Sequence, residues 1–220
     1  YPDTRVDVQG IGSSAGMKML NEDGCEIGMA SRQLKQTELD WGLEPIAIAY
    51  DGIAVVIHPS NDITDLTKEE IQKIFMGQIT NWSEVGGADE EILVVSREDG
   101  SGTRGAFEEI LKLDGDQGSM VVENALIAEG NGAVKANIAS KSQAIGYISL
   151  GIVDETVKAL LVDGAQATVE NIKSNVYGVS RPLNMATKGE MSELARAYLD
   201  FVMSPEGQKI VADHYIPVVD

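Results

Sequence analysis

A loop dense in hydroxyl groups carries the clearest chemical signal in this sequence. Residues 96–103 read SREDGSGT and contain Arg97, Ser101, Gly102 and Thr103. A guanidinium can hold an oxyanion with two parallel hydrogen bonds, and serine and threonine hydroxyls can add further donors. Glycine lets the backbone approach a ligand closely. These residue types at this spacing predict a site for a small anion.

The segments on either side of this loop would position such a site. Ile92–Val95 is typical of a buried strand, and Phe107, Ile110 and Leu111 recur at helical spacing after the loop. A loop that leads from a strand into a helix offers unpaired backbone N–H groups and the positive end of the helix dipole. A tight turn with an ordinary N-cap is the alternative. A nucleotide P-loop is not supported, because no lysine follows Gly102.

A second segment repeats this pattern near the start of the chain. Val6–Val8 is expected to be a short strand, and residues 10–16, GIGSSAG, lead into a helix that carries Met17 and Leu20. Two such loops could clamp an anion if they face each other across a cleft, with Ser13 as a donor. The alternative is that a serine of this loop only caps its helix.

One acidic residue lies inside an otherwise apolar stretch. Ile46–Ile57 is the longest extended candidate, and Asp51-Gly52 interrupts it. A buried acid is costly unless it is hydrogen-bonded or paired with a cation, so Asp51 could have a functional role. The alternative is a turn between two strands, which Asp-Gly favours. Val176–Val179 is expected to be another short strand, ended by Arg181-Pro182.

Helix signals complete the coarse prediction. Thr67–Glu70 fits a capping box, Ser192–Met203 has apolar residues on one helical face, and Ser204-Pro205 fits the start of a further helix. Strands and helices alternate along the chain, which predicts an α/β fold.

Composition narrows the classes of function. The chain has 220 residues, 35 acidic and 17 basic, and a net charge of −18. This balance argues against nucleic acid and anionic membranes as partners, and it requires local donors for any anion specificity. One cysteine and two histidines make an unsuitable set for zinc, so we expect neither a metal nor a cofactor. The apolar runs are too short to cross a membrane. The sequence is not expected to begin with a signal peptide, so if the protein is exported this would be a mature or trimmed form.

Several segments together resemble one known family, the phosphate-binding subunits of phosphate ABC transporters, which are periplasmic or lipoprotein solute-binding proteins. They occur in the family's order and cover nearly the whole chain. The segments are VDVQGIGSSAGMKML, EIGMASRQL, IAYDGIAVVIHP, LTKEEIQKIFMGQITNW, SREDGSGTRGAFEE and SPEGQKIVADHYIPV.

The resemblance implies a two-lobed, periplasmic-binding-protein-like (type II) α/β fold, with the ligand in a cleft between lobes joined by two crossovers. Lobe one would be Tyr1–His58 plus Val176–Asp220, and lobe two would be Pro59–Asn175. The family's first strand–loop–helix unit is expected to be missing, because Tyr1-Pro2-Asp3 matches the end of that unit's helix.

The resemblance also implies a set of ligand-binding residues. One branch of the family has an aspartate after the serine that matches Ser31, whereas this chain has Arg32, and Asp51 is the nearest substitute. A carboxylate that accepts the proton of phosphate would exclude sulfate, which has no proton to donate. Asp99 is expected to steady Arg97. The expected phosphate-binding residues are Ser13, Ser31, Arg32, Asp51, Arg97, Ser101, Gly102 and Thr103.

The function that follows is non-enzymatic binding of inorganic phosphate and its delivery to the membrane permease of an ABC transporter. The alternatives are a binding protein for sulfate or molybdate, a phosphate sensor or surface protein, and an enzyme acting on phosphate esters. The enzyme is disfavoured because His58 and His214 lie in no catalytic motif. We expect a monomer at the periplasmic or extracellular face of the cell membrane, with a lipid anchor as one option.

Overall fold

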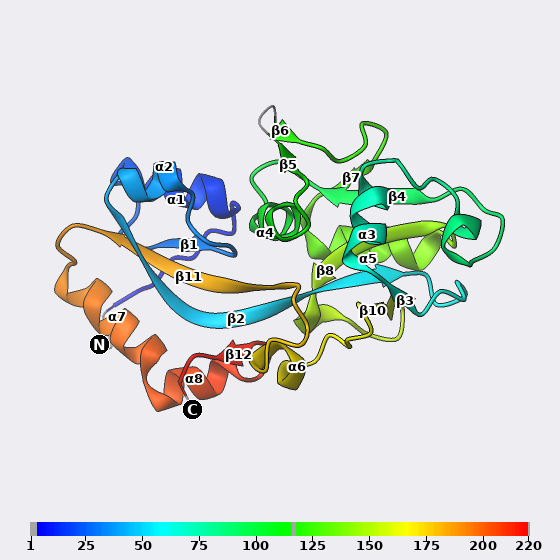
Figure 1. Ribbon diagram of the computed structural model, residues 1–220. Helices are drawn as coiled ribbons and strands as arrows, with labels where there is room; N and C mark the ends of the chain where they lie inside the picture. Colours follow the sequence, from blue (N-terminus) through cyan, green and yellow to red (C-terminus); the bar gives the residue numbers. More distant parts are fainter. Residues whose placement is uncertain (1–3, 116–117, 220) are drawn as a thin grey trace.

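The computed structural model describes residues 4–115 and 118–219 (Figure 1). The expectation for Tyr1-Pro2-Asp3 therefore lies outside the described residues. The α-helices are α1 (Ser13–Asn21), α2 (Gln36–Asp40), α3 (Lys68–Phe75), α4 (Gly102–Ile110), α5 (Gly130–Ser140), α6 (Val169–Lys173), α7 (Glu193–Met203) and α8 (Pro205–Val211), and the 3-10 helices are η1 (Trp82–Val85) and η2 (Leu150–Ile152). The strands are β1 (Gly28–Ala30), β2 (Leu43–Ile57), β3 (Asp65–Leu66), β4 (Leu93–Arg97), β5 (Asp114–Gly115), β6 (Gly118–Ser119), β7 (Leu126–Ala128), β8 (Ala144–Ser149), β9 (Lys158–Ala159), β10 (Leu161–Val162), β11 (Ser180–Lys188) and β12 (Ile216–Pro217).

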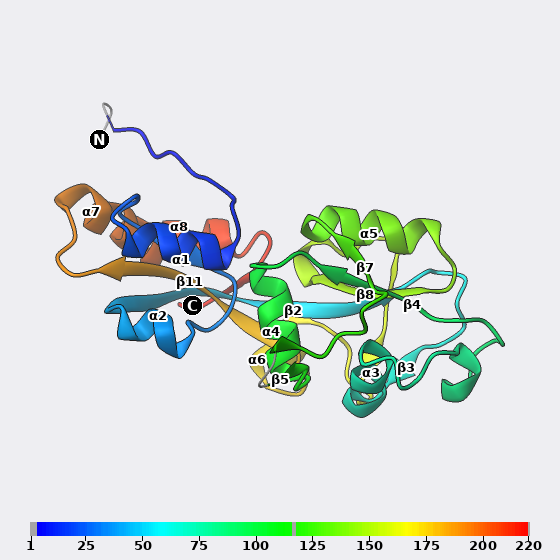
Figure 2. The same cartoon turned by 90° about the horizontal axis from the view of Figure 1, so that it is seen from above.

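A mixed sheet in the order β1-β11-β2-β8-β4-β7 organises the molecule. The strand β4 is parallel to both neighbours, and the other pairs along this order are antiparallel. Figures 1 and 2 show β2 running through two groups of elements. We call α1, α2, β1, β11 and α7 the α1 half, and α3, α4, α5, β4, β7 and β8 the α4 half. The predicted α/β class is confirmed.

The long strand β2 connects the two halves. Leu43–Gly52 pairs with β11, and Ile53–Ile57 pairs with β8. The Asp-Gly turn considered for this stretch does not form, because Asp51 lies opposite Arg181 in the β2–β11 ladder. The lobe boundaries at residues 58/59 and 175/176 stay a prediction.

Two expected strands are absent from the described chain. Residues 176–179 form no strand, and β11 instead begins at Ser180 and runs through Arg181 and Pro182. Tyr177 in the preceding segment is fully buried, and its hydroxyl donates to Ile53 O at 2.8 Å. Val179 O accepts from Ile53 N at 2.8 Å, so this segment is bonded to β2 without forming a regular ladder. Residues 6–8 lie in an exposed extended segment, residues 4–12, which pairs with no strand that the structure describes.

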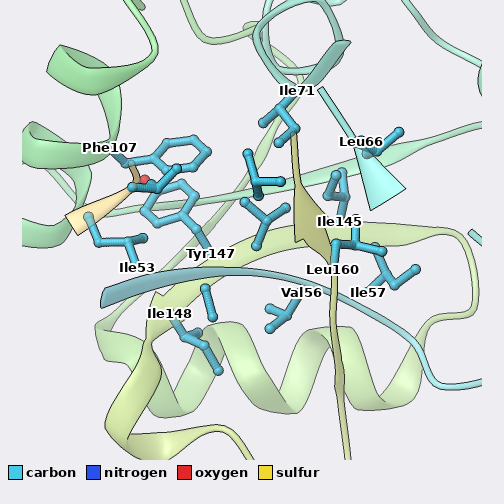
Figure 3. Close-up of a cluster of buried hydrophobic side chains, with 14 of the residues drawn as sticks. Ile53, Val56, Ile57, Leu66, Ile71, Phe107, Ile145, Tyr147, Ile148 and Leu160 are labelled. Carbon is cyan, nitrogen blue, oxygen red and sulfur yellow. The ribbon is translucent and has the colours of Figure 1, made fainter. Parts of the chain in front are cut away.

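The main hydrophobic core lies in the α4 half (Figure 3). All six residues of β8 are buried. Phe107 of α4 stacks on Tyr147 of β8 with ring centroids 3.9 Å apart, which fixes α4 against one face of the sheet. On the other face, Gly146 allows α5 to approach closely, since a Cβ there would lie 3.0 Å from Val134 Cγ1. A smaller cluster beneath α1 is made of Met17, Leu20, Ala30, Leu34, Leu43 and Ala186.

The predicted helix starts outside the loops are confirmed. Thr67 Oγ1 accepts from Glu70 N at 3.1 Å, and Glu70 Oε2 accepts from Thr67 N at 2.8 Å, which makes the capping box of α3. Ser192 caps α7, and Ser204 caps α8 with Pro205 at its first position. Within the described ranges, no helix is long and apolar enough to cross a membrane.

Candidate anion-binding site

A cavity of about 1600 Å³ lies between the two halves. Its lining becomes apolar toward α7, where Leu194 and Phe201 contribute. The polar lining includes residues of the two predicted loops and of the ends of β1, β8, β11 and α5, namely Ser13, Ser31, Arg97, Ser101, Gly102, Thr103, Asn131, Ser149 and Arg181. Further charged residues, among them Glu98, Asp99 and Lys188, also line the cavity. The structure thus brings together residues that are up to 168 positions apart, from Ser13 to Arg181.

The first turns of α1 and α4 meet in this cavity. Ser14 N donates to Gly100 O at 3.4 Å across the two halves. A Cβ added to Gly102 would overlap the Ser13 hydroxyl and lie 3.0 Å from Ser31 Cβ, so the backbone of α4 can approach α1 only because residue 102 is glycine. Gly12 has a φ of 89°, which also favours glycine. Two helix starts with unpaired N–H groups therefore face one site.

Three hydroxyl groups in the lining keep a hydrogen for a ligand. Ser13 Oγ accepts from Ser31 N at 3.0 Å, Ser101 Oγ accepts from Arg104 N at 3.2 Å, and Thr103 Oγ1 accepts from Arg97 Nη1 at 3.3 Å. Because a hydroxyl that accepts a hydrogen bond can still donate one, each group can bind an anion oxygen. Ser101 is also the N-cap of α4, so capping and ligand binding are compatible roles here.

Arg97 projects from the end of β4 and is held on several sides. Its Nε and Nη2 donate to Glu98 at 2.8 and 2.7 Å, and its Nη1 donates to Asn131 at 2.9 Å and to Thr103. The Arg97 guanidinium lowers the pKa of Glu98 to about 2, and the N–H of Gly130 adds to the same shift. These bonds leave one hydrogen on Nη2 of the five that a guanidinium carries.

A second arginine lines the cavity from β11. Arg181 donates from Nε and Nη2 to Asp51 Oδ2, at 3.2 and 2.8 Å, and from Nη1 to Ser31 O at 3.3 Å. These bonds use three of its five hydrogens, which leaves one on each terminal nitrogen. Burial lowers the pKa of Arg181, and the charge of Asp51 acts in the opposite direction.

Two of the predicted ligand residues do not line the cavity in the described structure. Arg32 is buried in a bidentate pair with Glu38, with both N–O distances 2.8 Å, and it also donates to Ser14 Oγ at 3.2 Å. Asp51 lies one layer behind Arg181 and Ser149, to which it is bonded. Arg32 thus contacts Ser14, the neighbour of Ser13, and Asp51 contacts two lining residues directly.

The prediction that Asp99 steadies Arg97 is wrong. Asp99 pairs with Arg104 at 2.7 Å, whereas Arg97 pairs with the adjacent Glu98. Sequence reasoning also missed Arg181. Arg181 lies in β11, whose sequence SRPLNMATK mixes polar and apolar residues, so a charge there does not stand out as Asp51 does in its apolar stretch.

The chemistry of the lining suits hydrogen bonding to an oxyanion. Arg97 and Arg181 are each neutralised by a carboxylate, so a ligand would be held mainly by N–H and O–H donors rather than by excess positive charge. Across residues 4–115 and 118–219, no three histidine, cysteine or acidic side chains are grouped so that they could hold a metal ion.

Comparisons with known proteins identify the family of this chain. The family model described as PBP superfamily domain matches residues 1–206. The phosphate-binding protein PstS of Bacillus subtilis (strain 168) is 34% identical over 227 residues, which cover 100% of this chain and 73% of that protein. PstS of Borreliella burgdorferi is 29% identical and is covered to 78%, with 96% of this chain aligned.

Solved structures match over nearly the whole chain. A protein from Clostridium perfringens, assigned as a phosphate ABC transporter substrate-binding protein and crystallised with bound phosphate, superposes with a TM-score of 0.93 at 47% identity, covering 99% of this chain and 89% of that one. An ABC-type phosphate transport receptor from Vibrio cholerae gives a TM-score of 0.87 at 37% identity, with coverages of 98% and 89%. These matches confirm the predicted periplasmic-binding-protein-like fold. The chain belongs to the PBP superfamily and, within it, to the family of phosphate-binding proteins PstS.

Proposed function

We propose that the chain binds inorganic phosphate in the cavity between its two halves, as a binding protein rather than an enzyme, and delivers it to the membrane permease of an ABC transporter. One observation carries this proposal: two helix starts and three hydroxyl groups with a hydrogen to donate converge beside Arg97. The Clostridium perfringens relative, 47% identical, was crystallised with bound phosphate, and the Bacillus subtilis relative is a phosphate-binding protein.

The roles of individual residues form part of this proposal. Ser13, Ser101 and Thr103 donate hydroxyl hydrogens, Gly102 and its neighbours donate backbone N–H groups, and Arg97 donates from Nη2. Ser31, which lines the cavity, contributes through its main chain to the positions of Ser13 and Arg181. In this arrangement Arg32 and Asp51 act from behind the lining, so they hold the site in place rather than touch the anion.

The setting of the protein is also proposed. Lobe one comprises residues 1–58 and 176–220, lobe two comprises residues 59–175, and the cavity closes as the lobes approach. The protein works as a monomer at the periplasmic or extracellular face of the membrane. A phosphate sensor or surface protein would use the same site. Sulfate and molybdate offer oxygens to the same donors, and the experiment below separates them from phosphate.

Calorimetric titration with phosphate, sulfate and molybdate tests the function. We expect tight phosphate binding and much weaker binding of the other two. Gly102→Ala places a Cβ against Ser13 and should abolish phosphate binding while the protein stays folded. Gly132→Ala is the matched control, because a Cβ at this position in α5 meets nothing within 4 Å. A folded chain that binds no phosphate, or a Gly102→Ala variant that binds as well as the control, would contradict the proposal.

A further inference from the structure

Ser149 differs from Ser13, Ser101 and Thr103 in the direction of its hydrogen bond. Ser13, Ser101 and Thr103 accept from N–H donors. Ser149 instead donates from Oγ to Asp51 Oδ1 at 2.9 Å, because an ionised carboxylate has no hydrogen to offer. The hydrogen of Ser149 is therefore committed to Asp51, and only its lone pairs remain for a ligand.

The orientation of Asp51 is fixed by Arg181. Asp51 Oδ2 accepts both Nε and Nη2 of Arg181, which leaves Oδ1 for Ser149. Asp51 is 2% exposed and Ser149 is 3% exposed, so there is little room for water to replace either partner. Ser149 and Arg181 line the cavity, whereas Asp51 does not.

We infer that Ser149 is the residue that distinguishes phosphate from oxyanions without a proton, and that Asp51 is a positioning residue that acts through it. This inference rests on the proposed function. Phosphate near neutral pH carries at least one proton, so one of its O–H groups can donate to Ser149 Oγ. Sulfate and molybdate carry none, and one of their oxygens would face the lone pairs of Ser149 without a hydrogen between them. Rejection by an unmatched buried acceptor is a strong form of discrimination.

The two carboxylate oxygens of Asp51 have different hydrogen-bond partners, so replacing Asp51 by asparagine should reverse the hydrogen bond to Ser149. In Asp51→Asn, the amide oxygen should face Arg181, because a guanidinium offers only donors. The NH₂ group then faces Ser149 and donates to it. The Ser149 hydroxyl must turn, and its hydrogen becomes available to the ligand. Ser149 would change from an acceptor into a donor without any change in the shape of the site.

The test measures the ratio of the dissociation constants for sulfate and phosphate by calorimetry in three variants. Ser149→Ala removes the acceptor and should lower this preference for phosphate by about 10- to 100-fold, mainly through weaker phosphate binding. Asp51→Asn should lower the preference further, because sulfate binding should become tighter. Asp62→Asn, an exposed position with the same change in charge, should leave the ratio unchanged.

The outcomes separate this inference from the proposed function. A preference for phosphate that survives in Ser149→Ala would overturn the inference while leaving phosphate binding intact as a function. Loss of the preference in Asp51→Asn but not in Ser149→Ala would also overturn it, since Asp51 would then act on the ligand directly. If Asp51→Asn fails to fold, Ser149→Ala decides alone. A folded wild-type chain that binds no phosphate would overturn both proposals.

Discussion

The two arginines that line the cavity are held in contrasting ways. Arg97 pairs with its neighbour in the sequence, Glu98, whose side chain is 33% exposed. Arg181 pairs with Asp51, 130 positions away, and the two side chains are 4% and 2% exposed. The first pair touches solvent and lies at the end of a strand, whereas the second pair is buried and joins opposite positions of two adjacent long strands.

Because of this difference in burial, we expect the two arginines to have different roles. An ion pair near solvent can adjust its geometry when an anion enters, because water can take over part of the interaction with Glu98. A buried ion pair has no such substitute, and breaking it leaves an uncompensated charge. We therefore expect Arg97 to act mainly in binding, and Arg181 to act in both binding and the stability of the junction between the halves.

Removing Arg97 should have the largest effect on phosphate affinity. Arg97→Ala deletes a charged donor and leaves Glu98 as an unpaired negative charge beside the anion. We expect a loss of at least roughly 100-fold in affinity by calorimetry, since bonds to charged groups are the strong ones. Arg196→Ala, on the exposed face of α7, is the matched control and should bind as the wild type does. Tight phosphate binding by Arg97→Ala would mean that Arg97 does not bind the anion.

Replacing Arg181 by lysine should have a smaller effect on affinity and a larger one on stability. A lysine keeps the charge but cannot hold Asp51, Ser31 O and an anion together, because its ammonium lacks the planar fork of a guanidinium. We expect about tenfold weaker phosphate binding and a loss of about 1–3 kcal/mol in the free energy of unfolding. Arg97→Lys provides the comparison and should lower stability less. Equal losses of stability would mean that burial does not distinguish the two pairs.

The Arg97–Glu98 pair should show itself in the pH dependence of stability. The folded-state pKa of Glu98 is lowered from 4.5 to about 2. A lowered carboxyl pKa gives stability that is fully present above pH 4.5 and is lost as the pH falls through the folded value near 2. Melting temperatures of the wild type and of Glu98→Gln should therefore differ near neutral pH and converge as the pH falls through this range. A difference that stays constant with pH would contradict the assignment.

The parts of the molecule that could be predicted from sequence are those built by neighbouring residues. The strand β4, the loop after it and the start of α4 lie within one short stretch, where an arginine followed by glycine and hydroxyl residues predicted an anion site. The capping box of Thr67 and Glu70 spans one helical turn. In both cases the residues that interact are close in the chain, so their types and spacing carry the geometry.

The parts that could not be predicted depend on which distant strands pair. Asp51 inside an apolar stretch indicated that a partner must exist, but nothing local identifies Arg181, which stands opposite it only because β2 and β11 are adjacent in the sheet. The role of Ser149 depends in turn on Asp51, 98 positions away. The Arg181-Pro182 pair suggested a strand end, and the β2–β11 ladder overrode that local preference.

The smallest effect on affinity is expected at Arg32, and it tests whether a third arginine belongs to the binding group. Arg32 and Glu38 are 3% and 4% exposed and satisfy each other. The double change Arg32→Met with Glu38→Leu replaces a buried ion pair by apolar side chains of similar size, a replacement that is often neutral for stability. We expect phosphate affinity within about threefold of the wild type, because the pair acts from behind the lining.

Arg32→Met alone should lower the melting temperature, since it leaves the carboxylate of Glu38 buried without its guanidinium. A loss of affinity in the double variant as large as that of Arg97→Ala would place Arg32 among the residues that bind the anion, and would mean that the Arg32–Glu38 pair opens when the ligand enters.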